Sequence, residues 1–225
     1  LLKRAEPARN ALREAAAELA RQRREGSPAW LLEARAARLL GDRAGAVELV
    51  DRVLALGRDP EVRLQAWLLK GSLAVEQGQL AEARQALKEA RRLLKDDPAL
   101  RAGVAGLAGQ LALADQRPDQ AGMEFDKEAA FYQRAARWAD MADALRRSGQ
   151  AYAVAGRPAD AALRFFRSAR SLYAQGQLVP ALQAMEKAAE FATAAGDEAL
   201  SADTGRLLEE IRQAVGVARA AGQVE

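Results

Sequence analysis

One stretch of the sequence, residues 67–98 (WLLKGSLAVEQGQLAEARQALKEARRLLKDDP), constrains the fold more than any other. It is typical of two antiparallel helices joined at Gly78, with Pro98 ending the second. Small residues on one face of each helix allow the two backbones to approach closely. These are Gly71, Ala74, Ala83 and Ala90. Because one such hairpin cannot bury its apolar stripes alone, we expect similar hairpins stacked beside it.

Equivalent turns recur along the chain at intervals of 37, 38, 40 and 40 residues. They fall at Gly41, Gly78, Gln116, Gly156 and Gly196. An alanine stands five residues after each of the first four turns, and a bulky apolar residue follows four positions later. These pairs are Ala46 and Val50, Ala83 and Leu87, Ala121 and Phe125, and Ala161 and Phe165. Several positions that repeat in register indicate a repeat architecture.

The order of these residues resembles the tetratricopeptide repeat (TPR) family: Trp67, a small residue, a turn glycine, an alanine, a bulky apolar residue and a late proline. The resemblance is strongest over 27–98 and 142–173, whereas Ser201 and Gly205 depart from it. It implies an all-α fold, a right-handed α-solenoid of antiparallel helix pairs that binds protein or peptide. The family period is about 34 residues, so either the helices or the turns between repeats are longer here.

On this register we expect an N-terminal capping helix, a repeat array and a C-terminal capping helix. Their bounds are 1–26, 27–196 and 197–225. The units of the array are about 27–63, 64–101, 102–136, 137–177 and 178–196, the last being the first helix of the final unit. The N-terminal helix has a basic outer face, so an arm that touches an acidic partner or a lipid surface stays an alternative, as does half of a degenerate repeat.

Composition excludes several classes of function. The chain has no Cys and no His, which removes disulfides, thiol nucleophiles, the usual zinc sites and imidazole bases. Adjacent carboxylates such as Asp96 and Asp97 point about 100° apart on a helix and cannot share a substrate. We therefore expect no enzyme, no catalytic residues, no cofactor and no metal site. A net charge of +3 on 34 basic and 31 acidic groups is close to balance, so no nucleic acid partner is expected.

The compartment stays open at this stage. No run reaches the roughly 18 apolar residues of a membrane span. The sequence starts at Leu1 rather than Met, which suggests a removed leader or a trimmed chain. A periplasmic or envelope location and a cytoplasmic one both fit, and nothing indicates the oligomeric state.

Two places depart from the regular pattern. The third unit carries Gly103, Gly106 and Gly109 on its first helix, and we expect close packing there because Gly109 falls in the slot of Gly71. Between Gly122 and Gly149 there is no Gly or Pro, yet the register predicts a turn at 134–136. The aromatic residues around that turn are Phe131, Tyr132 and Trp138. We expect them to form a tight core between repeats, the alternative being a patch that faces a partner.

The fourth unit is rich in arginine, with a charge of +4 over 142–181 against −4 over 182–225. The arginines are Arg146, Arg147, Arg157, Arg164, Arg167 and Arg170. They are interpreted either as pairing with neighbouring repeats or, along Arg164, Arg167 and Arg170, as a strip that binds an acidic partner.

The resemblance also implies that the first helix of each pair lines a concave groove. By register, the polar residues of that groove would be Arg35, Arg38, Gln65, Ser72, Glu76, Gln110, Asp143, Arg146, Gln150, Gln183, Glu186 and Glu190, beside Leu31 and Leu68. Such a lining suits a peptide held through its backbone amides and charges rather than an apolar small molecule. We therefore expect a non-catalytic scaffold whose partner is a protein or peptide. Two alternatives stay open: an accessory lipoprotein or assembly factor of a bacterial envelope complex, and a sensory or regulatory domain of a larger protein.

Overall fold

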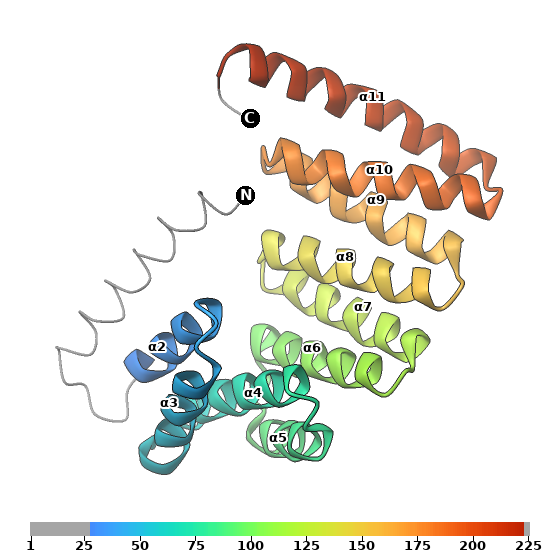
Figure 1. Ribbon diagram of the computed structural model, residues 1–225. Coiled ribbons are helices and arrows are strands. Elements are labelled where there is room, and N and C mark those ends of the chain that lie inside the picture. The colour runs from blue at the N-terminus through green and yellow to red at the C-terminus, as the bar shows by residue number, and fades with distance from the viewer. Residues whose placement is uncertain (1–27, 223–225) are drawn as a thin grey trace. The chain divides into compact units, whose positions relative to one another are not determined.

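The computed structural model describes residues 28–222, and all the regular secondary structure in that range is α-helical (Figure 1). The predicted N-terminal helix lies outside the described residues. The helices are α2 (Pro28–Leu39), α3 (Arg43–Leu56), α4 (Pro60–Glu76), α5 (Leu80–Leu93), α6 (Pro98–Ala114), α7 (Pro118–Arg134), α8 (Trp138–Val154), α9 (Pro158–Ala174), α10 (Leu178–Ala195) and α11 (Glu198–Ala220). Consecutive helices pack as antiparallel pairs, which confirms the predicted all-α class.

The turns fall where the register predicts them. Gly78 has a left-handed backbone (φ +73°), and the amide of Gln79 closes the end of α4 by donating to the carbonyl of Ala74 at 2.8 Å. The turn predicted at 134–136 has the same form without a glycine: Ala136 adopts φ +53°, and the Arg137 amide donates to the Tyr132 carbonyl at 2.9 Å. The repeat spacing therefore predicted this turn correctly, although its residues are not typical of a turn.

The chain divides into two compact units, 1–107 and 108–225, with the division inside α6. In the described part of the first unit, a core forms where α2, α3 and α4 meet. Its largest buried side chains are Leu31, Val50, Val53, Leu69 and Leu73. Gly71 lies against Leu107 with no room for a β-carbon, so the small residue there serves close packing, as expected.

In the second unit the helices α7 to α11 begin 20 residues apart, at 118, 138, 158, 178 and 198. Helices α7, α8 and α9 each have 17 residues, and the turns between them are short. The period of 40 residues in this unit therefore comes from long helices and not from long connections.

Glycines on the first helix of a pair admit an aromatic ring from the second. A methyl group on Gly109 would lie 2.6 Å from the ring of Phe125, and one on Gly149 would lie 3.0 Å from Phe165. Both rings are buried, so the core of the second unit depends on these glycines. The expectation of close packing at Gly109 is confirmed.

The aromatic residues near Ala136 do not form the tight core that we expected. Trp138 is 48% exposed, and Phe131 and Tyr132 are half-buried. Tyr132 packs against the cluster of Ala129 and Leu145, whereas Trp138 begins its helix and is not part of that cluster. The prediction of a tight core was thus wrong for Trp138. Within 28–222, no helix is long and apolar enough to cross a membrane.

Candidate functional site

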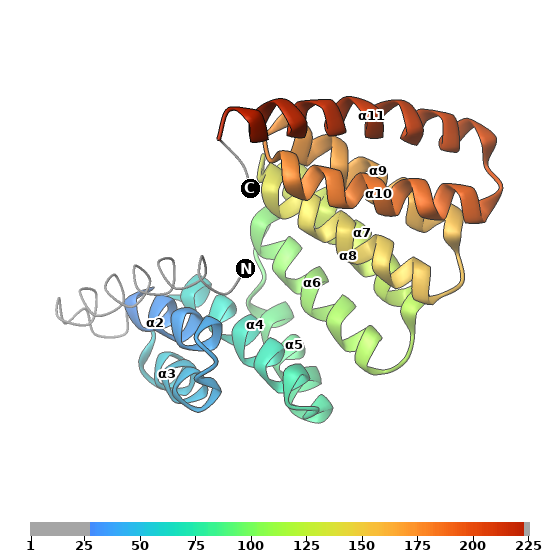
Figure 2. The ribbon, with the colours of Figure 1, turned by 45° about the horizontal axis from the view of Figure 1, so that its top comes forward.

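A cavity of about 700 Å³ opens between α8, α9 and α10, within the second unit (Figure 2 shows these helices). Its residues from α8 recur every three or four positions, so one face of that helix forms a wall. The floor comes from α9 together with Phe191 of α10, and the other lining residues of α10 form the opposite wall. The lining residues used below are Asp143, Arg146, Gln150, Phe165, Leu172, Gln183, Lys187 and Phe191.

The floor of this cavity is apolar. The rings of Phe165 and Phe191 are stacked, with centroids 5.8 Å apart and planes 6° from parallel. Phe165 is buried, whereas Phe191 and Leu172 are half-buried and leave apolar surface open to the cavity. A ligand side chain can therefore gain free energy by covering these groups.

The rim is polar and carries both signs of charge. Arg146 donates to the carboxylate of Asp143 at 2.6 Å, and Arg147 donates to the same group at 2.9 Å. Burial alone would raise the pKa of Asp143, but the hydrogen bonds and charges of the two arginines outweigh burial and lower it. Asp143 is therefore held as an anion beside the cavity. Across it, the ammonium of Lys187 lies 2.7 Å from Glu190.

Behind this rim lies a buried ion pair that sequence analysis missed. Arg147 also donates to Glu128 of α7 at 2.9 Å. Glu128 is only 3% exposed, and its second carboxylate oxygen has no hydrogen-bond partner. Burial raises the pKa of Glu128 to about 7, although the charge of Arg147 opposes this rise. Glu128 thus titrates near neutral pH.

The structure brings together four of the predicted groove residues of this unit. Asp143, Arg146, Gln150 and Gln183 line the cavity. The other three do not: Gln110 lies half-buried on α6, Glu186 pairs with Arg212 of α11 at 3.5 Å, and Glu190 pairs with Lys187.

The predicted residues of the first unit mostly contact one another. Arg35 donates to Gln65 at 3.0 Å, which links α2 to α4. Arg38 donates from Nε to Glu76 at 2.9 Å between the same helices. Ser72 is buried, which the prediction of an exposed groove residue did not anticipate.

Sequence reasoning missed the apolar floor and Lys187. Lys187 follows Gln183 by four residues, so helical spacing placed it on the same face. Phe191 follows by four more, and the same spacing was a signal for it. The expected polar lining therefore describes only the rim of the cavity. The expectation did not include the apolar floor.

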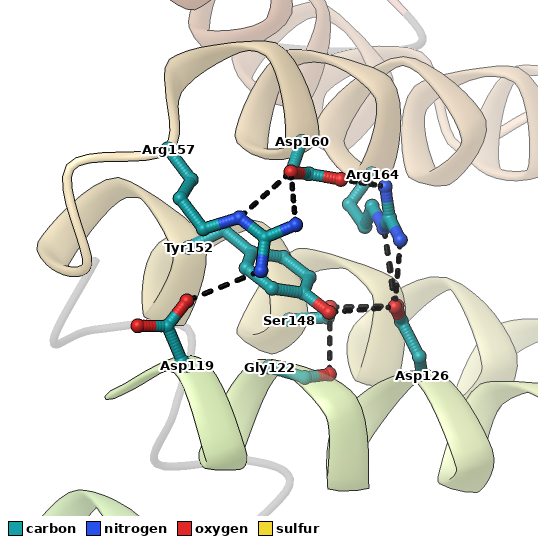
Figure 3. A network of polar contacts seen from close by, with 8 residues as sticks. All are labelled: Asp119, Gly122, Asp126, Ser148, Tyr152, Arg157, Asp160 and Arg164. Atoms are coloured by element: carbon teal, nitrogen blue, oxygen red, sulfur yellow. Dashed lines mark hydrogen bonds and ion pairs between the residues drawn. The ribbon is translucent and has the colours of Figure 1, made fainter. Parts of the chain in front are cut away.

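The arginine-rich unit is explained largely by internal pairing (Figure 3). Arg164 of α9 donates to Asp126 of α7 at 2.8 Å and to Asp160 at 2.8 Å. Arg157 donates to Asp119 at 3.1 Å and to Asp160 at 2.9 Å. For these arginines, pairing with the neighbouring repeat is confirmed.

The centre of this network is Tyr152, whose ring lies under both guanidinium groups, 4.7 Å from Arg157 and 4.9 Å from Arg164. The Ser148 hydroxyl, which is buried, lies 2.7 Å from Asp126 and 3.1 Å from the Gly122 carbonyl. These contacts join α7, α8 and α9, and so connect two of the three helices that line the cavity. In the range 28–222, no group of acidic side chains is arranged to hold a metal ion.

Among solved structures, the crystal structure of BtubC (BKLC) from P. vanneervenii is similar to this chain, with a TM-score of 0.66 and 18% sequence identity. The match covers 94% of this chain and 92% of that chain. No protein-family model matches the sequence, and no protein of curated function matches it either. At this level of identity the likeness concerns the fold, and it supports a TPR-like arrangement of helix pairs.

Proposed function

We propose that this chain is a non-catalytic scaffold that binds a protein or peptide segment, with the cavity between α8, α9 and α10 as its binding site. The observation that carries the proposal is the pairing of an apolar floor with a rim of amides and charges. The fold likeness to BtubC supports a repeat scaffold in general and identifies no partner.

The rim suits a polypeptide more than an apolar small molecule. Gln150 and Gln183 are exposed on facing helices, and each side-chain amide can donate to a backbone carbonyl and accept from a backbone amide. Arg146 and Lys187 are paired with Asp143 and Glu190, so the rim can form charge-assisted hydrogen bonds with groups of either sign on the segment. An apolar side chain of the same segment would cover Phe191 and Leu172. We therefore expect a segment with one apolar anchor and polar flanks.

The proposal is tested with short random peptides selected by display on the intact chain. Peptides that bind are measured by calorimetry against a rim variant, Gln150→Ala/Gln183→Ala, whose side chains are exposed and add little to stability. We expect at least a tenfold loss of affinity, about 1.4 kcal/mol. The matched control is Gln213→Ala, an exposed glutamine on α11 that does not line the cavity.

Peptides that bind the rim variant and the unmutated chain equally tightly would contradict the proposal. The same would follow if the Gln213→Ala control lost as much affinity as the rim variant. Circular dichroism of each variant verifies that the helices are retained.

A further inference from the structure

A second hollow, of about 600 Å³, lies on other faces of α8 and α9, and it shares no lining residue with the first. Gln133 borders it from α7. Trp138, Met141 and Leu145 come from α8, and Arg167, Arg170, Ser171 and Ala174 from α9, followed by Gln175. Trp138 lies at the edge of the hollow and is 48% exposed. Such exposure is unusual for a large aromatic side chain in a protein with only 5% aromatic residues.

The charge of this hollow is of one sign. Four arginines of the same region, at 146, 147, 157 and 164, form ion pairs with aspartate or glutamate. In contrast, Arg167 and Arg170 are exposed and form no ion pair within residues 28–222, and the hollow has no acidic lining residue. Arg170 lies 5.8 Å from the ring of Phe166, a contact that leaves its charge in place. Of the six arginines between residues 142 and 181, four are paired with carboxylates, and these two lie beside an exposed tryptophan.

We propose that this hollow binds an acidic protein segment that carries a bulky apolar side chain. The two guanidinium groups match carboxylates in bidentate geometry, and Trp138 with Met141 would receive the apolar group. Tryptophan and arginine are also the residues that most often dominate protein interfaces. This inference concerns a different surface from the proposed binding site, so either proposal can be refuted without affecting the other.

A nucleic acid is the less favoured occupant. Binding to phosphates needs several cations along a track, because each neutralised phosphate contributes separately. Here two arginines converge on one hollow, while the nearby Arg157 and Arg164 are already paired with carboxylates. The arrangement therefore fits a compact acidic motif better than a phosphate backbone.

The experiment makes Trp138 the reporter. The intact chain carries Trp30→Phe and Trp67→Phe, so tryptophan emission comes from Trp138 alone. The probe is a synthetic peptide with a central Leu-Phe pair flanked by Asp and Glu, and its counterpart has Asn and Gln at the flanks. We expect the acidic peptide to change Trp138 emission and to bind at least tenfold more tightly than its neutral counterpart at low salt.

The variant Arg167→Gln/Arg170→Gln should weaken the acidic peptide roughly tenfold and remove its preference over the neutral one. Arg206→Gln/Arg219→Gln removes two exposed arginines from α11 and should change nothing. The cavity variant Gln150→Ala/Gln183→Ala should also leave this binding unchanged, which separates the two sites. If the Arg167→Gln/Arg170→Gln variant binds the acidic peptide as tightly as the unmutated chain does, the inference is overturned.

A charge exchange sharpens the test. The variant Arg167→Glu/Arg170→Glu should reject the acidic peptide and bind a version with Lys flanks, since the apolar contacts remain. If it binds neither peptide while its circular dichroism matches that of the unmutated chain, charge recognition at these residues is refuted. A thymidine oligonucleotide that quenches Trp138 through the same two arginines, with no effect of the acidic peptide, would also overturn the proposal.

Discussion

The buried Glu128 makes a sharp prediction about stability and pH. Its pKa is raised to about 7 in the folded chain from an ordinary value of 4.5. Below pH 4.5 the carboxyl group is protonated in both the folded and the unfolded chain. Between pH 4.5 and 7 the unfolded chain releases this proton while the folded chain retains it, so the free energy of unfolding falls as pH rises.

The size of the effect follows from the two pKa values. Above pH 7 the full loss is about 3 kcal/mol, and most of it, about 2–3 kcal/mol, falls between pH 5 and pH 8. Because Glu128 is 3% exposed, solvent screening reduces it little. Glu128→Gln keeps the shape and a hydrogen-bond acceptor for Arg147 but cannot ionise. The free energy of unfolding of the Glu128→Gln variant should therefore lack this part of the decrease with pH.

The assay is urea unfolding of both chains at pH 5 and pH 8. Relative to the variant, the unmutated chain should lose about 2–3 kcal/mol between these pH values, because contributions from groups shared by both chains cancel. Glu190→Gln, which removes an exposed carboxyl group paired with Lys187, gives the baseline for losing a surface acid. The same pH dependence in the unmutated chain and in Glu128→Gln would refute the assignment of a raised pKa to Glu128.

Two further predictions concern the backbone. Gly109→Ala should lower the free energy of unfolding by about 1–3 kcal/mol, since its methyl group would lie 2.6 Å from the buried ring of Phe125. Gly205 on α11 has open space around it, so Gly205→Ala should instead raise the free energy of unfolding by up to about 1 kcal/mol. Urea titration measures both variants. Ala136→Gly should raise the melting temperature, because it removes the cost of a left-handed backbone at an alanine, roughly 1 kcal/mol. Ala135 has φ −84°, so Ala135→Gly should lower the melting temperature. Equal shifts from the two members of either pair would contradict the geometry described above.

The sequence predicted the helix pairs well because their signals are local or recur in register. Ala136 is the clearest example: its own identity opposes a turn, and only the positions one repeat later indicate it. Side-chain pairing was less predictable, because it depends on contacts across long separations. Arg164 and Arg167 are three residues apart on one helix, yet Arg164 contacts Asp126, 38 residues earlier, whereas Arg167 lies beside the hollow next to Trp138. Glu128 was missed for the same reason, since its partner Arg147 belongs to the next helix.

The charge of +4 over 142–181 therefore exaggerates what this region can offer a partner. Asp119, Asp126 and Glu128 lie before the segment in sequence but contact Arg157, Arg164 and Arg147 in the fold. Once those pairs are formed, the guanidinium groups serve helix packing, and removing them would test stability rather than recognition. The two arginines of this segment that remain exposed and form no ion pair within residues 28–222 are Arg167 and Arg170, and they converge with Trp138 on one hollow. Any acidic partner of this basic segment should accordingly depend on these two arginines and not on the sum of charge along the helix.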